Sequence, residues 1–132
     1  MSRYMCDTNT VSHIIKGHKT VGEHLRSVAM ERLCISAITE GELQFGCAKK
    51  PAAKRLHQLV AAFLSRVSVL PWDPLAASSY GLLRVRQEEM GKSLGPLDML
   101  IAAHALSAKA VLVSNDQAFR FVDGLKLEDW CH

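Results

Sequence analysis

The stretch Gly95-Pro96-Leu97-Asp98-Met99-Leu100-Ile101-Ala102-Ala103-His104-Ala105-Leu106 predicts the helix around which the rest of the chain is organised. Pro96 suits the first helical position, because the N–H that proline lacks would have no partner there. From Leu97 to Leu106 only Asp98 and His104 are polar, so we expect a buried helix with Asp98 in its first turn. The helix dipole alone favours a first-turn carboxylate by about 0.3–1 kcal/mol, so the other acids decide whether Asp98 belongs to a site.

The composition is that of one globular domain. Of the 132 residues, 48% are hydrophobic and 22% are charged, which is enough apolar material for a single core. We therefore expect one domain over residues 1–132. Lysine and arginine exceed aspartate and glutamate by 16 to 13, and the net charge of +3 mildly favours acidic partners such as nucleic acid.

The N-terminal residues and the cysteines indicate the cellular location. Met1-Ser2-Arg3-Tyr4-Met5-Cys6-Asp7 reaches a charge too early for a signal peptide, and no apolar run approaches the ~20 residues of a membrane span. We therefore expect a cytoplasmic protein with no membrane association. The four cysteines have neither a CxxC motif nor the Cys/His spacing of a zinc site, so we interpret them as reduced, mostly structural thiols.

Short apolar runs alternate with helical patterns along the chain. The runs expected to form strands are Tyr4–Cys6, Leu33–Ile35, Val67–Leu70, Ala110–Val113 and Leu125–Leu127. Helices are expected after Asp7, over Val21–Met30, Ala37–Cys47 and Pro51–Leu64, from Asp73-Pro74 to Met90, and over Gly95–Leu106 and Ala118–Val122, with Ser36 and Asp73 as N-caps. This alternation predicts an α/β fold in three layers, α/β/α, around a mainly parallel sheet.

Acidic residues follow the expected strands. Asp7 comes directly after the first strand, Asp116 lies just past the Val111–Val113 strand, and Glu42 projects from the helix after the second strand. Ligands of such sheets bind outside the carboxyl ends of the strands, so these three acids are expected at one edge. Asp98 joins them only if its helix begins at that same edge, which a single crossover helix does not guarantee.

Four carboxylates at one place call for a cation, because like charges at short range raise one another's pKa values. An all-oxygen ligand set suits Mg²⁺ or Mn²⁺, and acidic clusters of this kind serve phosphodiester chemistry by activating water and screening phosphate oxygens. Residues beside the acids are candidates for orienting the ligands or the water, although turn residues at strand ends are also ordinary. They are Thr8, Asn9, Ser114 and Asn115.

The ordered set of these fragments resembles the PIN-domain ribonucleases, and particularly the VapC-type toxins of bacterial toxin–antitoxin pairs. The resemblance spans roughly Tyr4 to Trp130. The fragments that carry it are Asp7-Thr8-Asn9, Ile35-Ser36-Ala37-Ile38-Thr39 with Glu42-Leu43 and Gly46, Gly95-Pro96-Leu97-Asp98, and Val113-Ser114-Asn115-Asp116 with Phe119.

This resemblance implies a PIN fold and a Mg²⁺- or Mn²⁺-dependent endoribonuclease that cuts structured RNA, often a transfer RNA. It also implies a homodimer, and a higher hetero-oligomer with a cognate VapB-type antitoxin whose C-terminal segment lies over the active site. Asp7, Glu42, Asp98 and Asp116 match the acidic positions of the family and are the expected catalytic and metal-binding residues. Many relatives carry Asn at the last position, so of the four acids Asp116 is the one for which the resemblance least implies direct metal ligation.

Three basic residues and one histidine have two interpretations each. Arg84, Arg86 and Lys92 are candidates for phosphate contacts near Asp98, and a solvated helix end explains them equally well. His104 is interpreted as a hydrogen-bonded core or interface histidine rather than a metal ligand.

Two other functions also fit acids at strand ends. In a phosphoacceptor domain Asp7 or Asp98 would be phosphorylated on Mg²⁺, but an evident lysine at a strand end is missing. In a non-catalytic module the acidic pocket would capture a basic peptide. Metal-dependent RNA cleavage that a chelator abolishes separates the three hypotheses.

Overall fold

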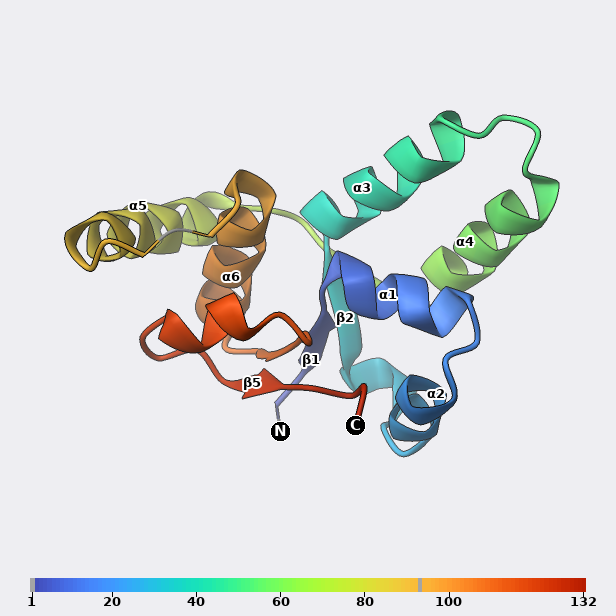
Figure 1. The fold of residues 1–132 in the computed structure, drawn as a ribbon, viewed down its shortest axis with the longest axis horizontal. Coiled ribbons are helices and arrows are strands. Elements are labelled where there is room, and N and C mark those ends of the chain that lie inside the picture. The colour runs from blue at the N-terminus through green and yellow to red at the C-terminus, as the bar shows by residue number, and fades with distance from the viewer. Residues whose placement is uncertain (1, 93) are drawn as a thin grey trace.

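The computed structural model describes residues 2–92 and 94–132, in which helices alternate with strands (Figure 1). The strands are β1 (Tyr4–Cys6), β2 (Leu33–Ser36), β3 (Ser68–Leu70), β4 (Val111–Val113) and β5 (Leu127–Glu128). The α-helices are α1 (Thr8–Ile15), α2 (Lys19–Arg26), α3 (Ala37–Ala48), α4 (Lys54–Arg66), α5 (Pro74–Glu89) and α6 (Pro96–Ala108). Two short 3₁₀ helices are η1 (Met30–Arg32) and η2 (Gln117–Phe121).

The five strands form one parallel sheet in the order β3-β2-β1-β4-β5. The central strand β1 pairs with β2 on one side and with β4 on the other. Parallel neighbours bring their carboxyl ends to one edge, which places the residues after β1 and β4 together. The predicted mainly parallel sheet is confirmed, and it is parallel throughout.

Alternate strand residues face two separate hydrophobic clusters, because successive side chains of a strand point to opposite faces. Met5 packs with Leu112 and with residues of α5, α6 and η2 such as Ile101. Cys6 and its neighbours on β2 and β4 pack instead with residues of α1 to α4. Figure 1 shows α5 and α6 on one side of the strands and α1 to α4 on the other. The predicted three-layer arrangement is therefore confirmed.

Two predicted helix boundaries are wrong by more than two residues. The helix expected to reach Met30 ends at Arg26, because the Ser27 hydroxyl donates to the carbonyl oxygen of His24 at 2.6 Å and the Ser27 N–H bonds the same oxygen. The helix expected from Pro51 begins three residues later, after a turn in which the Ala53 N–H donates to the Lys50 carbonyl oxygen. Hydrogen bonds in these turns thus override the periodic pattern.

The last two predicted elements are also shifted. The short helix expected at Ala118–Val122 is the 3₁₀ helix η2, which begins one residue earlier. The terminal strand is β5 at Leu127–Glu128 rather than Leu125–Leu127, because the Leu125 N–H closes a turn on the Val122 carbonyl oxygen and Gly124 has a φ of 81°. A left-handed φ of this kind is available to glycine without strain.

Two helices instead of one connect β3 to β4, and this decides where Asp98 lies. Asp73 caps α5 by accepting from the Ala76 N–H at 3.0 Å, as predicted, and α5 packs along α6. The chain then returns through the left-handed turn at Gly91 to begin α6 on the side where α1 and α3 also begin (Figure 1). None of the described helices is long and apolar enough to cross a membrane.

Candidate active site

Asp7 directly follows β1 and is fixed by its role as the N-cap of α1. Its Oδ1 accepts from the Thr10 N–H at 2.8 Å, which satisfies one of the free donors of the first turn. The Asp7 N–H and the Thr10 hydroxyl both donate to the Val113 carbonyl oxygen, at 3.0 and 2.9 Å. The start of α1 is thereby tied to the end of β4. The Asp7 side chain is only 3% exposed, and the bond to Thr10 uses one of its two oxygens.

Glu42 is held by a residue from another helix. The Thr8 hydroxyl donates to Glu42 Oε1 at 2.5 Å and also lies 3.5 Å from the Thr39 hydroxyl. Thr39 is fully buried and lies one turn before Glu42 on α3. The predicted orienting role of Thr8 is consistent with this contact, whereas the sequence analysis did not identify Thr39. The spacing Ser36, Thr39, Glu42 on one helix face is the sequence signal that could have found it.

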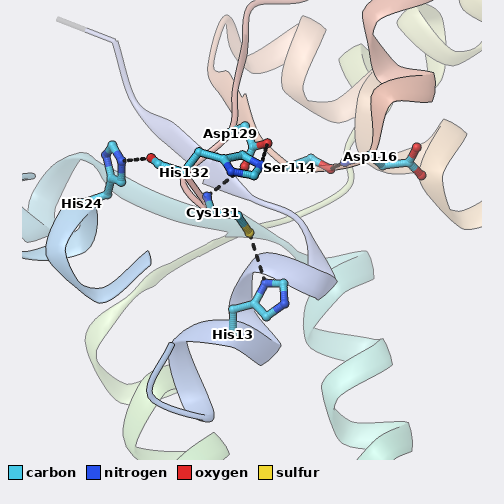
Figure 2. Close-up of polar contacts among 7 residues, drawn as sticks. All are labelled: His13, His24, Ser114, Asp116, Asp129, Cys131 and His132. Carbon is cyan, nitrogen blue, oxygen red and sulfur yellow. Dashed lines mark hydrogen bonds and ion pairs between the residues drawn. The ribbon is translucent and has the colours of Figure 1, made fainter. Parts of the chain in front are cut away.

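Asp116 is the N-cap of η2 and is oriented by Ser114, the residue that follows β4. Its Oδ1 accepts from the Ala118 N–H at 2.9 Å, and its own N–H donates to the buried Ser114 hydroxyl at 3.0 Å. Figure 2 shows Ser114 and Asp116 together with the end of the chain. The other two flanking residues are exposed: Asn9 lies on α1, and Asn115 lies beside the thiol of Cys131. For these two the orienting role remains a prediction.

Asp98 lies in the first turn of α6 and is half-buried. Its pKa is raised, first by burial and then by the negative charges of Asp116, Asp7 and Glu42. The position near a helix N-terminus favours the ionised form, so burial and the three acids together outweigh the helix dipole. The four predicted acids, from four separate parts of the chain, therefore act on one another at a single edge of the sheet.

The donor set suits a hard divalent cation, but the side chains do not form a closed cage. Hydrogen bonds use one oxygen of Asp7, Glu42 and Asp116, which leaves the second oxygen of each outside these bonds. All four groups are carboxylates, the ligands that Mg²⁺ and Mn²⁺ prefer. Over residues 2–92 and 94–132, no three His, Cys, Asp or Glu side chains are close enough to hold an ion as they stand. A cation at this edge therefore requires the carboxylates to move inward.

His104 is a core residue, as the sequence predicted. Its side chain is 3% exposed, and its Nδ1 lies 2.7 Å from the Ser36 hydroxyl oxygen. Burial lowers the pKa of His104, against a raising effect of Asp73, and Arg3 lowers it further. The same Ser36 oxygen accepts from the Ile38 N–H as the predicted cap of α3. The contact with the imidazole thus fixes Ser36, which is the last residue of β2 and the N-cap of the helix that carries Glu42.

The three predicted phosphate contacts lie on α5 and in the loop after it, in contact with neighbouring side chains. Arg84 pairs with Glu88 at 3.3 Å and donates to the Tyr80 hydroxyl at 3.1 Å. Arg86 pairs with Asp123 at 2.7 Å. The Lys92 ammonium lies 4.5 Å from the centre of the Phe121 ring. The contacts of Arg86 and Lys92 are at the end of η2 opposite to Asp116, whereas those of Arg84 are with residues of α5. The expected place of the three beside Asp98 remains a prediction.

The last residues of the chain are attached to α1 and α2 (Figure 2). The Cys131 sulfur lies 3.6 Å from His13 Nδ1, and His24 Nε2 lies 3.1 Å from the His132 carbonyl oxygen. Burial raises the pKa of Cys131, Asp129 raises it further, and Asp7 adds a smaller effect from the end of β1. The thiol is therefore neutral at ordinary pH. All four cysteines are free thiols, as predicted.

Comparisons with known proteins agree with this geometry. The family model of the PIN domain matches residues 4–125. The chain is 38% identical over 135 aligned positions to the "tRNA(fMet)-specific endonuclease VapC" of Salmonella typhimurium strain LT2, covering 99% of this chain and 100% of the relative. It is 34% identical to the protein of the same description from Shigella flexneri, covering 98% of this chain and 99% of the relative.

Solved structures show the same fold at similar identity. A DNA-bound VapBC structure from Salmonella typhimurium superposes with a TM-score of 0.92 at 38% identity, covering 99% of this chain and 100% of the other. VapBC2 from Rickettsia felis, bound to a DNA fragment from its promoter, gives a TM-score of 0.88 at 31% identity, covering 96% of this chain and 98% of the other. The family match over most of the chain and the full-length relatives above 30% identity agree with one another. The chain therefore belongs to the PIN domain family of nucleases, among the VapC ribonucleases.

Proposed function

We propose that this chain is a metal-dependent endoribonuclease that acts as the toxin of a toxin–antitoxin pair. The observation that carries the proposal is the gathering of Asp98 with Asp7, Glu42 and Asp116, in which burial and then the charges of these three acids raise the pKa of Asp98. These acids come from four separate parts of the chain and are gathered at the strand edge where ligands of parallel sheets bind. Membership of a ribonuclease family favours this function over a phosphoacceptor domain or a non-catalytic acidic pocket.

In the proposed site, the four carboxylates would hold Mg²⁺ or Mn²⁺. A bound ion of this kind supplies activation of water and screening of the phosphate oxygens. Thr8 keeps one oxygen of Glu42 occupied and so aims the other, while the Thr10 N–H does the same for Asp7. Asp98 has no such partner among the hydrogen bonds of the described residues. No donor in this part of the chain therefore offsets its burial and the negative charges of the three other acids. We assign it the role of a direct ligand.

The proposed substrate is structured RNA, with transfer RNA as the class. The full-length relatives from Salmonella and Shigella carry tRNA(fMet) specificity in their descriptions. A groove of about 260 Å³ begins at Thr8 and Glu42 and is also lined by Lys16, Lys49 and Lys50. Lysines beside an acidic cluster suit a phosphate backbone that approaches the cleaved bond, since each can contact one phosphate.

The proposed partner is a VapB-type antitoxin, and we expect a homodimer that forms a higher hetero-oligomer with it. The structures from Salmonella and Rickettsia are described as VapBC complexes. Four acids attract arginine or lysine when no cation is bound. The same groove has an apolar floor that includes Leu43, Leu56 and Val60, which suits an inhibitory segment with both basic and apolar residues.

Cleavage of a transfer RNA preparation by the purified chain tests the catalytic proposal. Cleavage in Mg²⁺ should stop in excess EDTA, and Asp98→Asn should abolish it because a hard anionic ligand is lost. Glu42→Gln should behave in the same way. Glu40→Gln is the matched control, because residues two apart point to different sides of a helix. Wild-type rates in Asp98→Asn, or cleavage that persists in EDTA, would contradict the proposal.

Coexpression tests the proposed partner. The product of a small gene next to this one should bind the chain and restore growth of cells that express it. A neighbouring gene product that neither binds nor protects would remove the toxin assignment and leave the nuclease assignment intact.

A further inference from the structure

The side chain of Phe121 at the end of η2 lies beneath two cations. The Lys92 ammonium lies 4.5 Å from the ring centre, and the Arg120 guanidinium carbon lies 5.0 Å from it. The ring is nevertheless 37% exposed. A large apolar side chain that stays accessible beside two basic groups combines the two features that bind nucleic acid, a stacking surface and positive charge.

A shallow cavity of about 640 Å³ lies against this ring. Its lining includes two basic residues, Arg86 and Arg120, and two acidic residues, Glu89 and Asp123. The positive charge of Arg86 is compensated by its 2.7 Å ion pair with Asp123. Lys92 and Arg120 therefore carry the remaining positive charge beside the ring. The surface is therefore weakly basic, with its positive charge concentrated at Phe121.

The backbone of η2 fixes the ring relative to the candidate active site. Asp116 caps the beginning of η2, and Phe121 is its last residue. At about 2 Å of rise per residue of a 3₁₀ helix, the two lie about 10 Å apart along its axis. That span corresponds to about three nucleotides of a stacked strand at about 3.4 Å each. The buried Gln87 side chain donates to the Phe121 carbonyl oxygen at 3.3 Å, so α5 anchors this position through the main chain.

We propose that Phe121, Lys92 and Arg120 form an RNA-binding subsite, in which a base stacks on the ring and the two cations contact the flanking phosphates. The subsite rests on the proposed function in that its ligand is the RNA strand that passes the four acids. An exposed cation–π contact contributes only about a two- to fivefold effect, whereas a base on an aromatic ring contributes about five- to a hundredfold. A base therefore displaces either cation from the ring face, and each freed cation has a phosphate within reach.

Equilibrium binding of a fluorescein-labelled single-stranded RNA of about twelve nucleotides tests the subsite. Binding is measured in EDTA, with electrophoresis to confirm that the RNA stays intact. Phe121→Leu keeps an apolar side chain but removes the ring, and we expect about tenfold weaker binding. Phe121→Tyr should restore wild-type affinity, because it restores the stacking surface. Leu75→Ala is the control for loss of an exposed apolar side chain, since Leu75 is 68% exposed at the other end of α5.

The salt dependence of binding tests the two cations. Lys92→Gln and Arg120→Gln should each reduce the slope of log K against log salt by about 0.7, the value for one phosphate contact on a single strand. Lys54→Gln, at the exposed start of α4, should leave the slope unchanged. Circular dichroism and melting temperature check that each variant is folded.

Unchanged RNA affinity in a folded Phe121→Leu variant would overturn the subsite. The subsite is equally overturned if that variant only weakens self-association, because the ring would then belong to a protein interface. Failure of the subsite is distinguishable from failure of the proposed function. In the first case wild-type protein still cleaves transfer RNA in Mg²⁺, and in the second it does not, whatever the Phe121 variants do to binding.

Discussion

Replacement of Asp98 by asparagine should stabilise the protein in the absence of divalent metal. The pKa of Asp98 is raised by burial and by three like charges, so the folded state holds this proton to a higher pH than the unfolded state does. Its contribution to stability is therefore most favourable below the ordinary aspartate pKa of about 3.9. It is lost as the pH rises through that value toward the raised one. At neutral pH the ionised carboxylate is a net cost, which the neutral amide removes.

The expected size follows from the groups that act on Asp98. Three like-charged partners, at roughly 0.2–0.5 kcal/mol each for solvent-screened pairs, repel it by about 1 kcal/mol, and relief of its partial burial adds to the gain. Loss of the favourable helix-dipole interaction opposes this by about 0.3–1 kcal/mol. The net stabilisation is about 0.5 kcal/mol or somewhat more, which corresponds to about 2–3 °C in melting temperature for a domain of this size.

Melting temperatures of wild type and Asp98→Asn, each in EDTA and in excess Mg²⁺, measure the effect. Wild type should gain about 2.7 kcal/mol at a hundredfold excess of Mg²⁺ over its Kd, or about 10 °C, because only the folded chain presents the assembled site. The variant should gain much less. Asp123→Asn is the control, since Asp123 is an exposed partner of Arg86 away from the four acids. A variant that melts below wild type in EDTA and gains as much from Mg²⁺ would refute the reasoning.

Three further predictions concern residues around the site. Thr8→Val should lower RNA cleavage about tenfold with an unchanged circular dichroism spectrum, because Glu42 loses the hydroxyl that orients it; full activity in this variant would make the contact incidental. The lowered pKa of His104 means that wild type should lose stability as the pH falls below about 6.5, where only the unfolded state takes up the proton, and urea denaturation at pH 7 and pH 5.5 should show a smaller difference for His104→Gln. Asp73→Ala should cost about 1 kcal/mol in the same assay by removing the cap on the Ala76 N–H, whereas Asp73→Asn should cost much less; equal losses would point to the charge instead.

Local sequence signals predicted most of the fold because they act over a few residues. Ser36 and the pair Asp73-Pro74 fix helix starts through hydrogen bonds within the same turn, and the apolar run at the start of β4 has few alternatives to a buried strand. The wrong boundaries have an equally local cause. At Ser27 and Pro51 the chain satisfies its hydrogen bonds in a turn, and apolar periodicity does not report this choice.

The candidate site was less predictable because its contacts join distant parts of the chain. The four acids were identified by their places after strands and by the family pattern, but the position of Asp98 depends on the return of the chain through α5 and the Gly91 turn. The hydrogen bond from Thr8 to Glu42 joins two helices that the sequence does not orient toward each other. The contact of Cys131 with His13 spans 118 positions and has no local signal.

The central place of β1 in the sheet also sets when the nuclease becomes complete during synthesis. β1 pairs with β2 through Tyr4 and Leu33, but its partner residues on β4 begin only at Val111, so β4 is synthesised long after β1 and β2. The hydrogen bond from Thr10 to Val113 closes 103 residues of chain, and Asp116 follows only after it. A nascent chain that stops before β4 thus has Asp7, Glu42 and Asp98 but neither the strand that fixes the first of them nor the fourth acid. The order of the strands delays assembly of the proposed catalytic centre until β4 and Asp116 have been synthesised.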